Sequence, residues 1–403
     1  MNARFMRFND SGGTMDNYKT IVLGLGFGLS TMAFTTGANA VDLLKTNNTK
    51  ITLYGQINKG LLSVNDGNDT TTFGIVDNDN SSSRIGVKST TNLGAGWKLK
   101  GKVELQHEIA STGDINQNNR TGTRAQFDLT DDQVIRKIEA SIGHKSYGTL
   151  TFGQGSTASD GAANIDLSGT KVVSLDPELL AGGILFFDNV TGALSGSRNI
   201  GDDFDNLDGG RLLRIRYDTP TIKGFTLSGA YGQQQLRRGN GPRDDRDTWD
   251  VALRYKETLG DFKVQGAVFY ADREAAVGAT NQRTRVGFSA ATLHKPTGYN
   301  FRIAAGQEDN ESRTEKGDFV HVKAGVIKNF FKSGPTAIAV DYYTSNALAD
   351  EGSQGNSWGL SVVHNFKKPK IELYAALRNY SLDEPGNDFE DVSALLTGIR
   401  WKF

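Results

Sequence analysis

Apolar and polar residues alternate along most of the chain after about residue 50. In the segment 97–106, Trp97, Leu99 and Val103 share one parity, whereas Lys98 and Lys102 share the other. A period of two places the apolar side chains on one face of a β-strand and the polar side chains on the opposite face. The pattern therefore predicts strands that have one apolar face and one polar face.

Sixteen segments of this kind follow one another, as one opening strand, seven hairpin pairs and one closing strand. An even number of antiparallel strands lets a sheet close into a barrel with both chain ends on one side. The predicted strands are 51–61, 83–89, 97–106, 134–143, 148–154, 211–219, 224–232, 248–256, 262–271, 285–293, 299–306, 319–327, 336–344, 357–364, 371–380 and 392–403.

The connections between these segments alternate in length. Those within a pair are short, such as 144–147, whereas those between pairs are longer and polar, such as 308–318. Membrane-spanning barrels show this asymmetry. A soluble sandwich would have to bury its apolar face against a second sheet, and no repeat supports a solenoid. We therefore expect an all-β fold, a transmembrane antiparallel β-barrel of sixteen strands.

The N-terminus predicts export. Basic residues (Arg4, Arg7 and Lys19) precede an apolar stretch at 21–34, and Ala38-Asn39-Ala40 follows. The apolar stretch is shorter than the about 20 residues that a membrane-spanning helix needs. A secretory signal at 1–40, cut after Ala40, is therefore favoured over an N-terminal anchor. The barrel domain would be 41–403, and Met15 is an alternative start.

Composition excludes several other classes of function. Lys and Arg (45) nearly balance Asp and Glu (46), which gives no reason to expect a nucleic-acid partner. The chain has no cysteine, and its 5 histidines lack metal-ligand spacing. The acidic stretch at 203–209 lacks the regular spacing of a calcium loop. We therefore expect no enzyme activity, no cofactor and no metal site.

Several segments resemble the general diffusion porins of Gram-negative bacteria, the 16-stranded trimeric outer-membrane type. The resemblance covers most of the mature chain, although its sharp motifs are few. It is carried by Ile51-Thr-Leu-Tyr-Gly-Gln56, Ser83-Arg-Ile-Gly-Val-Lys88, Tyr147-Gly-Thr-Leu-Thr-Phe-Gly153 and Arg216-Tyr-Asp-Thr-Pro220. It implies a water-filled channel for passive diffusion of small hydrophilic solutes and ions. It also implies that the long connection at 155–210 folds inward as a constriction loop.

The C-terminus resembles the signal that the barrel-assembly machinery reads in this family. Trp401 and Phe403 end an alternating apolar edge, and such recognition is strand addition at an exposed sheet edge. Leu396 departs from the family pattern, because many such signals carry a polar residue there.

The expected pore chemistry is a set of opposed charges at the constriction. Opposed charges make a transverse field, and rings of one sign bias ion choice. The basic pore-lining candidates are Arg84, Lys100, Lys102, Lys137, Arg214 and Arg216, and the acidic constriction-loop candidates are Asp160, Asp166, Asp176 and Glu178. The alternative is that these side chains are merely solvated in a wide lumen.

The expected location is the outer membrane, with lipid and lipopolysaccharide around the barrel. Small hydrophilic solutes and ions would be the cargo, and a homotrimer is implied by the resemblance. Two alternatives remain open at this point. One is a porin selective for a sugar or an anion, and the other is a surface adhesin or structural barrel with a blocked lumen.

Overall fold

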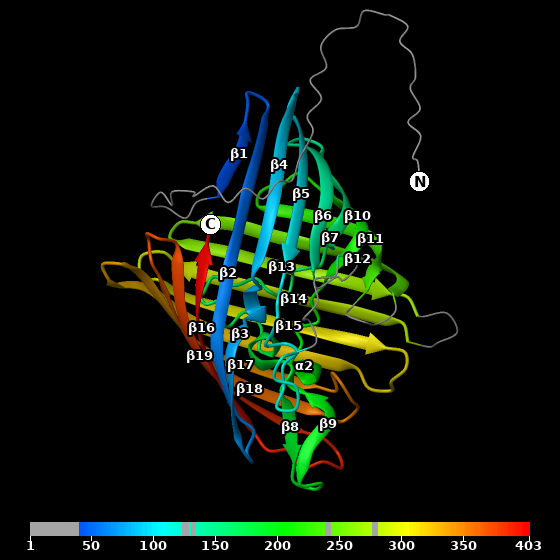
Figure 1. Cartoon of the computed structure of the whole chain (residues 1–403). Helices are drawn as coiled ribbons and strands as arrows, with labels where there is room; N and C mark the ends of the chain where they lie inside the picture. The colour runs from blue at the N-terminus through cyan, green and yellow to red at the C-terminus, as the bar shows by residue number, and fades with distance from the viewer. Residues whose placement is uncertain (1–39, 123–128, 130–133, 238–242, 276–280) are drawn as a thin grey trace, which may run out of the picture. The chain divides into compact units, whose positions relative to one another are not determined.

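Long antiparallel strands make up most of the computed structural model, which describes residues 40–122, 129, 134–237, 243–275 and 281–403. The predicted signal at 1–40 lies outside these residues, apart from Ala40. Sixteen strands pair in sequence into a closed wall (Figure 1), and all sixteen were predicted from the alternation. The wall strands are β2 (Thr49–Asn65), β4 (Arg84–Gly94), β5 (Trp97–Gln106), β6 (Ile135–His144), β7 (Gly148–Ser156), β10 (Arg211–Asp218), β11 (Phe225–Arg237), β12 (Arg243–Leu259), β13 (Phe262–Arg273), β14 (Arg283–His294), β15 (Tyr299–Asn310), β16 (Gly317–Phe331), β17 (Gly334–Asn346), β18 (Gln354–Asn365), β19 (Ile371–Asp383) and β20 (Val392–Lys402).

The barrel closes where β20 pairs with β2. The register runs from Gln56 opposite Lys402 to Asn65 opposite Ser393. One step further, Gly55 and Phe403 exchange backbone hydrogen bonds of 2.9 and 3.0 Å. Closure leaves no open edge along this part of the wall, which is what a sheet needs in order to satisfy its backbone groups in lipid.

The outer face of the wall is apolar, as the alternation predicted. On β12, Trp249, Val251 and Leu253 are each at least 40% exposed, whereas Asp250 and Ala252 between them are buried. Aromatic rings meet across neighbouring strands on this face, for example Phe225 with Tyr255 and Trp249 with Tyr270. An apolar exterior is the expected surface of a barrel in a bilayer. Among the described residues, no helix is long and apolar enough to cross a membrane.

Seven short elements were not predicted. β1 (Val41–Lys45) pairs with the start of β2, and β3 (Thr70–Asp77) pairs with its end. The 3-10 helix η1 (Asp79–Ser81) follows β3. The long connection between β7 and β10 contains α1 (Glu178–Ala181), the hairpin β8 (Leu185–Asp188) and β9 (Ala193–Asn199), and α2 (Ile200–Asp203).

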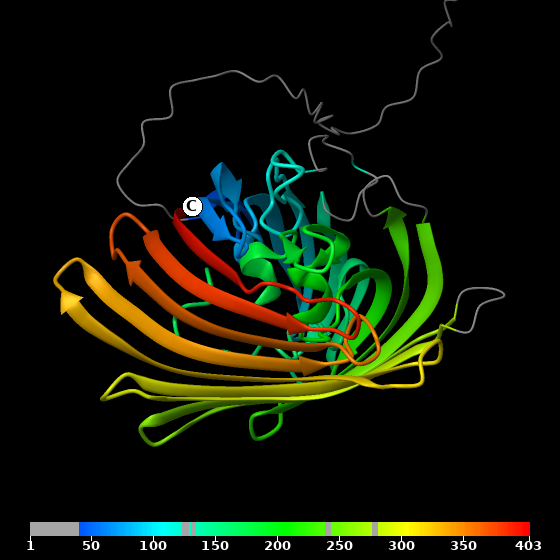
Figure 2. The same cartoon turned by 90° about the horizontal axis from the view of Figure 1, so that it is seen from below.

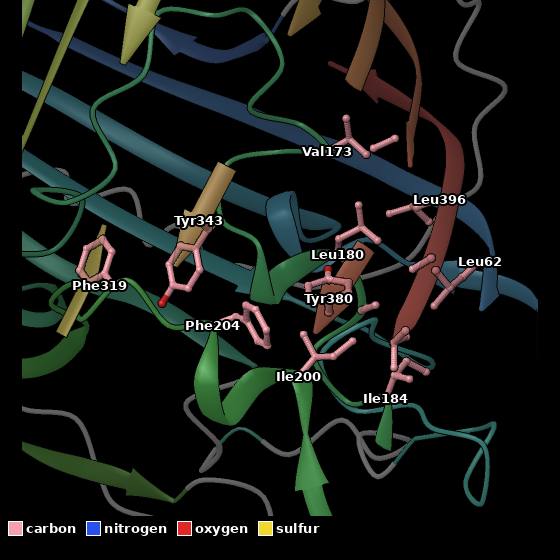
Figure 3. Close-up of a cluster of buried hydrophobic side chains, with 14 of the residues drawn as sticks. Leu62, Val173, Leu180, Ile184, Ile200, Phe204, Phe319, Tyr343, Tyr380 and Leu396 are labelled. Carbon is pink, nitrogen blue, oxygen red and sulfur yellow. The ribbon is translucent and has the colours of Figure 1, made fainter. Parts of the chain in front are cut away.

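An apolar core lies within the lumen (Figure 3). Leu180, Ile184 and Phe204 come from the connection between β7 and β10, and they pack with wall residues such as Tyr380 and Leu396. All five side chains are at most 1% exposed. The connection is therefore held inside the barrel by hydrophobic burial, in the way that a soluble domain holds its core.

The seam between β2 and β20 gives a first testable prediction. A Cβ atom at Gly55 would lie 2.5 Å from Cζ of Phe403 and 2.8 Å from the carbonyl oxygen of Arg84. Gly55→Val should therefore hinder closure, at a cost of about 1–3 kcal/mol for overpacking. The fraction of refolded protein that keeps the fast-migrating folded form on unheated gels measures this effect. Gly74→Val is the control, because a Cβ there meets nothing within 4 Å. Equal folding of both variants would contradict the prediction.

Candidate functional site

Residues 157–210, which we call the inner loop, lie inside the curve of the wall strands (Figure 2). The first half of the inner loop runs along the wall and contacts several of its strands in order. The contacts are Ser159 with Asp250 on β12, Ala162 with Ser289 on β14, Ala163 with Arg302 on β15, Asp166 with Lys323 on β16, Ser174 with Asp341 on β17 and Pro177 with Tyr380 on β19. The inner loop is therefore fastened to the β12–β19 side of the barrel.

The tip of the inner loop also reaches the segments that follow β3 and β5. The Asn78 side chain donates to the carbonyl oxygen of Val172 at 2.7 Å, and the Leu175 amide donates to Asn80 at 2.9 Å. The Thr112 hydroxyl donates to the carbonyl oxygen of Leu179 at 2.8 Å. The inner loop thus spans the lumen and narrows it.

A buried ionic network joins the inner loop to the wall. Lys323 and Asp166 are paired at 2.9 Å, and both side chains are 0% exposed. Beside them, Asp341 is paired with Arg378 and is hydrogen-bonded to His321. Burial alone would raise the pKa of the Asp166 carboxyl, but Lys323 and Arg302 hold this pKa below its usual value. Asp166 therefore stays ionised because its cationic partners are buried with it.

The four predicted loop carboxylates fall into two groups. Asp166 and Asp176 are 4% and 2% exposed, and Asp176 accepts a hydrogen bond from Asn206. Burial and the neighbouring Asp205 raise the pKa of Asp176. Burial removes these two side chains from any aqueous passage, so the expectation that they line the constriction is corrected. Asp160 and Glu178 are only partly buried.

The six predicted basic residues also divide. Arg214 is 6% exposed and is paired with Glu139 at 2.6 Å, so it does not line open water. Arg216 is paired with Asp218 at 2.7 Å and donates to the carbonyl oxygen of Thr157. The Lys137 ammonium donates to the Ser156 hydroxyl at 2.8 Å. These three residues fasten the end of β7, and Arg216 also holds the first residue of the inner loop. Arg84, Lys100 and Lys102 have the inward parity of their strands and are exposed or partly exposed.

Arg84 belongs to a cluster of cations on the wall, which we call the Arg84 cluster (Arg84, Arg136, Arg211 and Arg400). The three other guanidiniums lie near enough to repel the Arg84 charge, and Glu104 attracts it. Glu104 accepts a hydrogen bond from Arg136 at 3.0 Å and is paired with Lys102 at 3.2 Å. Glu104 therefore faces Arg84, Arg136 and Lys102, whereas Arg400 is paired with Glu372 on the same part of the wall.

The sequence reasoning missed three members of this cluster. Arg400 has inward parity on β20 and could have been found from the alternation. Arg136 has the parity of the outward Ile138, so the alternation places it outside. A register shift between β5 and β6 at Glu104 and Leu105 turns Arg136 inward, as β-bulges do. Arg211 begins β10, at the end of the inner loop, where the alternation starts.

The acidic stretch at 203–209 is explained by its protein partners. The Asp203 side chain accepts a hydrogen bond from Ser353, and the Asp208 side chain accepts from the amides of Ala162 and Gly209. Burial and the neighbouring Asp160 raise the pKa of Asp208. In the part of the chain that the structure describes, no group of three or more His, Cys, Asp or Glu could hold a metal ion.

Comparison with protein families identifies the chain. The model of the Gram-negative porin family matches residues 28–385. The chain belongs to the Gram-negative porins. The porin is accordingly an outer-membrane channel protein. A search of the curated proteins found no match.

Solved structures with the same fold are distant in sequence. The anion-selective porin of Comamonas acidovorans is 16% identical, with a TM-score of 0.57 over 88% of this chain and 100% of that one. The OmpF–daunomycin complex of Salmonella typhi is 13% identical, with a TM-score of 0.54 over 89% and 99%. The channel DcaP of Acinetobacter baumannii is 15% identical, with a TM-score of 0.53 over 90% and 100%. At these identities the likeness shows the barrel fold alone.

The two residues of the predicted assembly signal lie at the barrel seam. The rings of Trp401 and Phe403 are in contact, with centroids 5.4 Å apart. Trp401 is also the register partner of Ile371 on β19 and of Ile57 on β2. The position suits a strand that is added last to an open edge, but recognition by the assembly machinery stays a prediction.

Proposed function

We propose that the porin lets small hydrophilic solutes diffuse passively past the inner loop and that it prefers anions. The observation that carries this proposal is the Arg84 cluster, in which four guanidiniums lie together and the carboxylates of Glu104 and Glu372 offset only part of their charge. Rings of one charge sign bias which ions enter a pore, and low-dielectric walls focus their field. Several further lysines with inward parity, Lys88, Lys98 and Lys100, add to the positive side of the same wall.

Four related proposals complete this picture. We infer that residues 1–40 are removed on export and that the mature porin forms a homotrimer among lipid and lipopolysaccharide. A solved structure of the Vibrio cholerae outer-membrane protein OmpT is described as a trimer form, and it shares this fold with a TM-score of 0.53. We infer that Trp401 and Phe403 are read by the assembly machinery. We also infer that the porin catalyses no reaction, which its family and its fold favour.

Planar-bilayer recording tests the proposal. With KCl more concentrated on one side, the reversal potential should have the sign of chloride preference, because potassium and chloride have similar mobilities in free solution. A reversal potential at zero or of the opposite sign would contradict the anion preference. A complete lack of conductance would contradict the channel itself and would favour an adhesin with a blocked lumen.

A further inference from the structure

A second charged region lies apart from the Arg84 cluster, and we call it the outer alcove. It is a cavity of about 1130 Å³ between the second half of the inner loop and the ends of β14 and β15 that are joined to the long connections. Residues of the connections after β15, β17 and β19 complete its lining. Protein sites for small molecules have volumes of this order or somewhat less. The outer alcove therefore has room for a small hydrated solute.

The lining of the outer alcove carries charges of both signs. Guanidiniums come from the wall and from the connection after β15, as Arg283, Arg285 and Arg313. Carboxylates come from the inner loop, including Glu178 and Asp205. Asp205 and Glu178 lie near enough to Arg285 to attract its charge. The wall side of the cavity thus presents three guanidiniums beside three carboxylates, and the inner loop presents mainly carboxylates.

Part of this charge is neutralised within the protein. Glu308 is paired with Arg285 at 2.6 Å and stands 3.8 Å from Arg283. Arg198 is paired with Glu384 at 2.6 Å and with Asp350 at 2.8 Å. These pairs account for the two guanidiniums Arg285 and Arg198.

Arg283 and Arg313 are less fully matched. The two side chains lie near enough to repel each other, and the Arg313 guanidinium donates to the backbone oxygens of Ala347 and Leu348. Among the described residues, the buried Nε of Arg283 has no hydrogen-bond partner. Two adjacent guanidiniums with spare donors suit the two oxygens of a carboxylate.

The inner loop presents carboxylates to the same cavity. Asp205 lies near enough to the buried Asp176 to act on its charge, and Asp205 and Glu178 both act on Arg285 and Tyr343. Like charges held together are stabilised by a cation between or beside them. An ammonium group in the outer alcove would stabilise the negative charges of Glu178 and Asp205 in this way.

We propose that the outer alcove binds zwitterionic solutes of amino-acid or dipeptide size, an inference that rests on the proposed channel function. The carboxylate of the solute is bound by Arg283 and Arg313, and its ammonium is bound by Glu178 and Asp205. Seven carboxylates line the cavity beside four guanidiniums, so a simple anion is disfavoured. A simple cation is also disfavoured, because the three arginines of the wall repel it. The charged lining residues are Glu178, Asp188, Asp202, Asp205, Glu308, Asp350, Glu384, Arg198, Arg283, Arg285 and Arg313.

Because the alcove lies beside the narrowed lumen, binding there can favour the passage of one class of solute. Conduction requires sites that attract a solute but release it again. A weak site on the inner loop raises the local concentration of zwitterions beside the narrowed lumen, as charged clefts do for their substrates. The Arg84 cluster then sets the ion preference, and the outer alcove favours one class of organic solute.

Four forms of one dipeptide test the proposal. They are glycylglycine, which is zwitterionic, its N-acetyl form, which is anionic, its amide, which is cationic, and its N-acetyl amide, which is neutral. Binding to the full-length mature porin in detergent is measured by saturation-transfer NMR. Glycylglycine should bind roughly tenfold more tightly than each of the other three forms. Equal binding of the neutral form, or tightest binding of the anionic form, would overturn the proposal.

Charge-neutral variants assign the two ends of the solute. Arg283→Gln should weaken the zwitterion and the anionic form, whereas Glu178→Gln should weaken the zwitterion and the cationic form. Lys88→Gln is the matched control, because Lys88 is a wall lysine outside the alcove lining. Both residues that are changed are only partly buried, and the folded form on unheated gels verifies each variant. Unchanged binding in both alcove variants would also overturn the proposal.

Conductance and dipeptide binding, measured on the same samples, distinguish the channel proposal from the alcove proposal. If the porin conducts with chloride preference but binds no form of the dipeptide selectively, the alcove proposal fails and the channel proposal stands. If it binds glycylglycine selectively but does not conduct, the channel proposal fails.

Discussion

Replacing Lys323 with methionine should destabilise the porin and loosen the inner loop. Lys323 and Asp166 form an ion pair whose side chains are both 0% exposed, and the Lys323 ammonium also donates to the carbonyl oxygen of Ser174. Methionine fills the space but leaves the Asp166 carboxylate buried without its partner. Removal of one member of a buried pair costs about 3–5 kcal/mol, so this is the largest stability change that we expect from one substitution.

The effect should be visible in the channel as well as in stability. The pair joins the inner loop to β16, whereas contacts to β12, β15 and β17 remain in the variant. The inner loop should therefore stay in the lumen but move more. We expect noisier single-channel currents together with a lower thermal unfolding temperature in detergent.

Two further variants define the cause. Lys171→Met is the matched control, because Lys171 lies on the same loop but is exposed. In the double variant Lys323→Met with Asp166→Asn, no charge is left buried at this position, so much of the lost stability should return. A single Lys323→Met variant as stable as Lys171→Met would show that the pair does not anchor the loop.

Acid should act in the same direction as the substitution. Despite its burial, Asp166 has a pKa below its usual value because Lys323 and Arg302 stabilise its charge. A carboxyl whose pKa is lowered by folding contributes stability above its unfolded pKa and loses it as the pH falls toward the folded pKa. The unfolding temperature of the parent protein should therefore fall below about pH 4, and that of the double variant should fall less there.

The barrel wall was predictable because its physical constraint repeats at every second residue. Lipid outside and water or protein inside impose one alternation on sixteen strands, and the predicted strands all appear in the structure. Strand ends were less predictable. β12 and β16, for example, extend several residues beyond the predicted 248–256 and 319–327, since the wall continues where the outside is no longer lipid.

The interior of the lumen was less predictable because the inner loop has no period. Parity shows that a wall side chain points inward, but not whether it meets water or the loop. Arg214 has inward parity and is buried against Glu139, whereas Arg84 has the same parity and joins a partly exposed cluster. Likewise, Asp166 and Asp160 are both loop carboxylates, and only their packing separates an anchor from a partly solvated side chain.

The packing of Leu396 explains why an apolar residue occupies this position of the C-terminal signal. Its apolar side chain departs from the family signal at an inward position. In the structure it is 0% exposed and belongs to the apolar core with Leu62 and Leu180 (Figure 3). A polar residue there would be buried against the inner loop without water, which is costly. The departure from the signal therefore serves the packing of the loop.

Replacing Arg84 with glutamate should reduce the preference for anions more than any other single substitution on the wall. The change removes one guanidinium from a cluster of four and adds a second carboxylate beside Glu104. A pair of charges about 4 Å apart is worth about 1 kcal/mol even at the dielectric constant of water. A change of two charges should therefore lower the ratio of chloride to potassium permeability by roughly tenfold.

The dependence on salt strengthens this test. Interactions between exposed charges are screened over about 10 Å at 0.1 M salt and over about 3 Å at 1 M. The difference between Arg84→Glu and the parent protein should therefore be large in dilute KCl and small in concentrated KCl. A change that was independent of salt would point instead to an altered shape of the pore.

Lys295→Glu is the matched control, because it makes the same change of charge at an exposed residue in the turn between β14 and β15. Its reversal potential should stay close to that of the parent protein. If Arg84→Glu and Lys295→Glu behaved alike, the narrow part of the pore could not lie beside Arg84. The field that selects ions would then have to arise elsewhere along the inner loop, and the charges of the outer alcove would be the next to test.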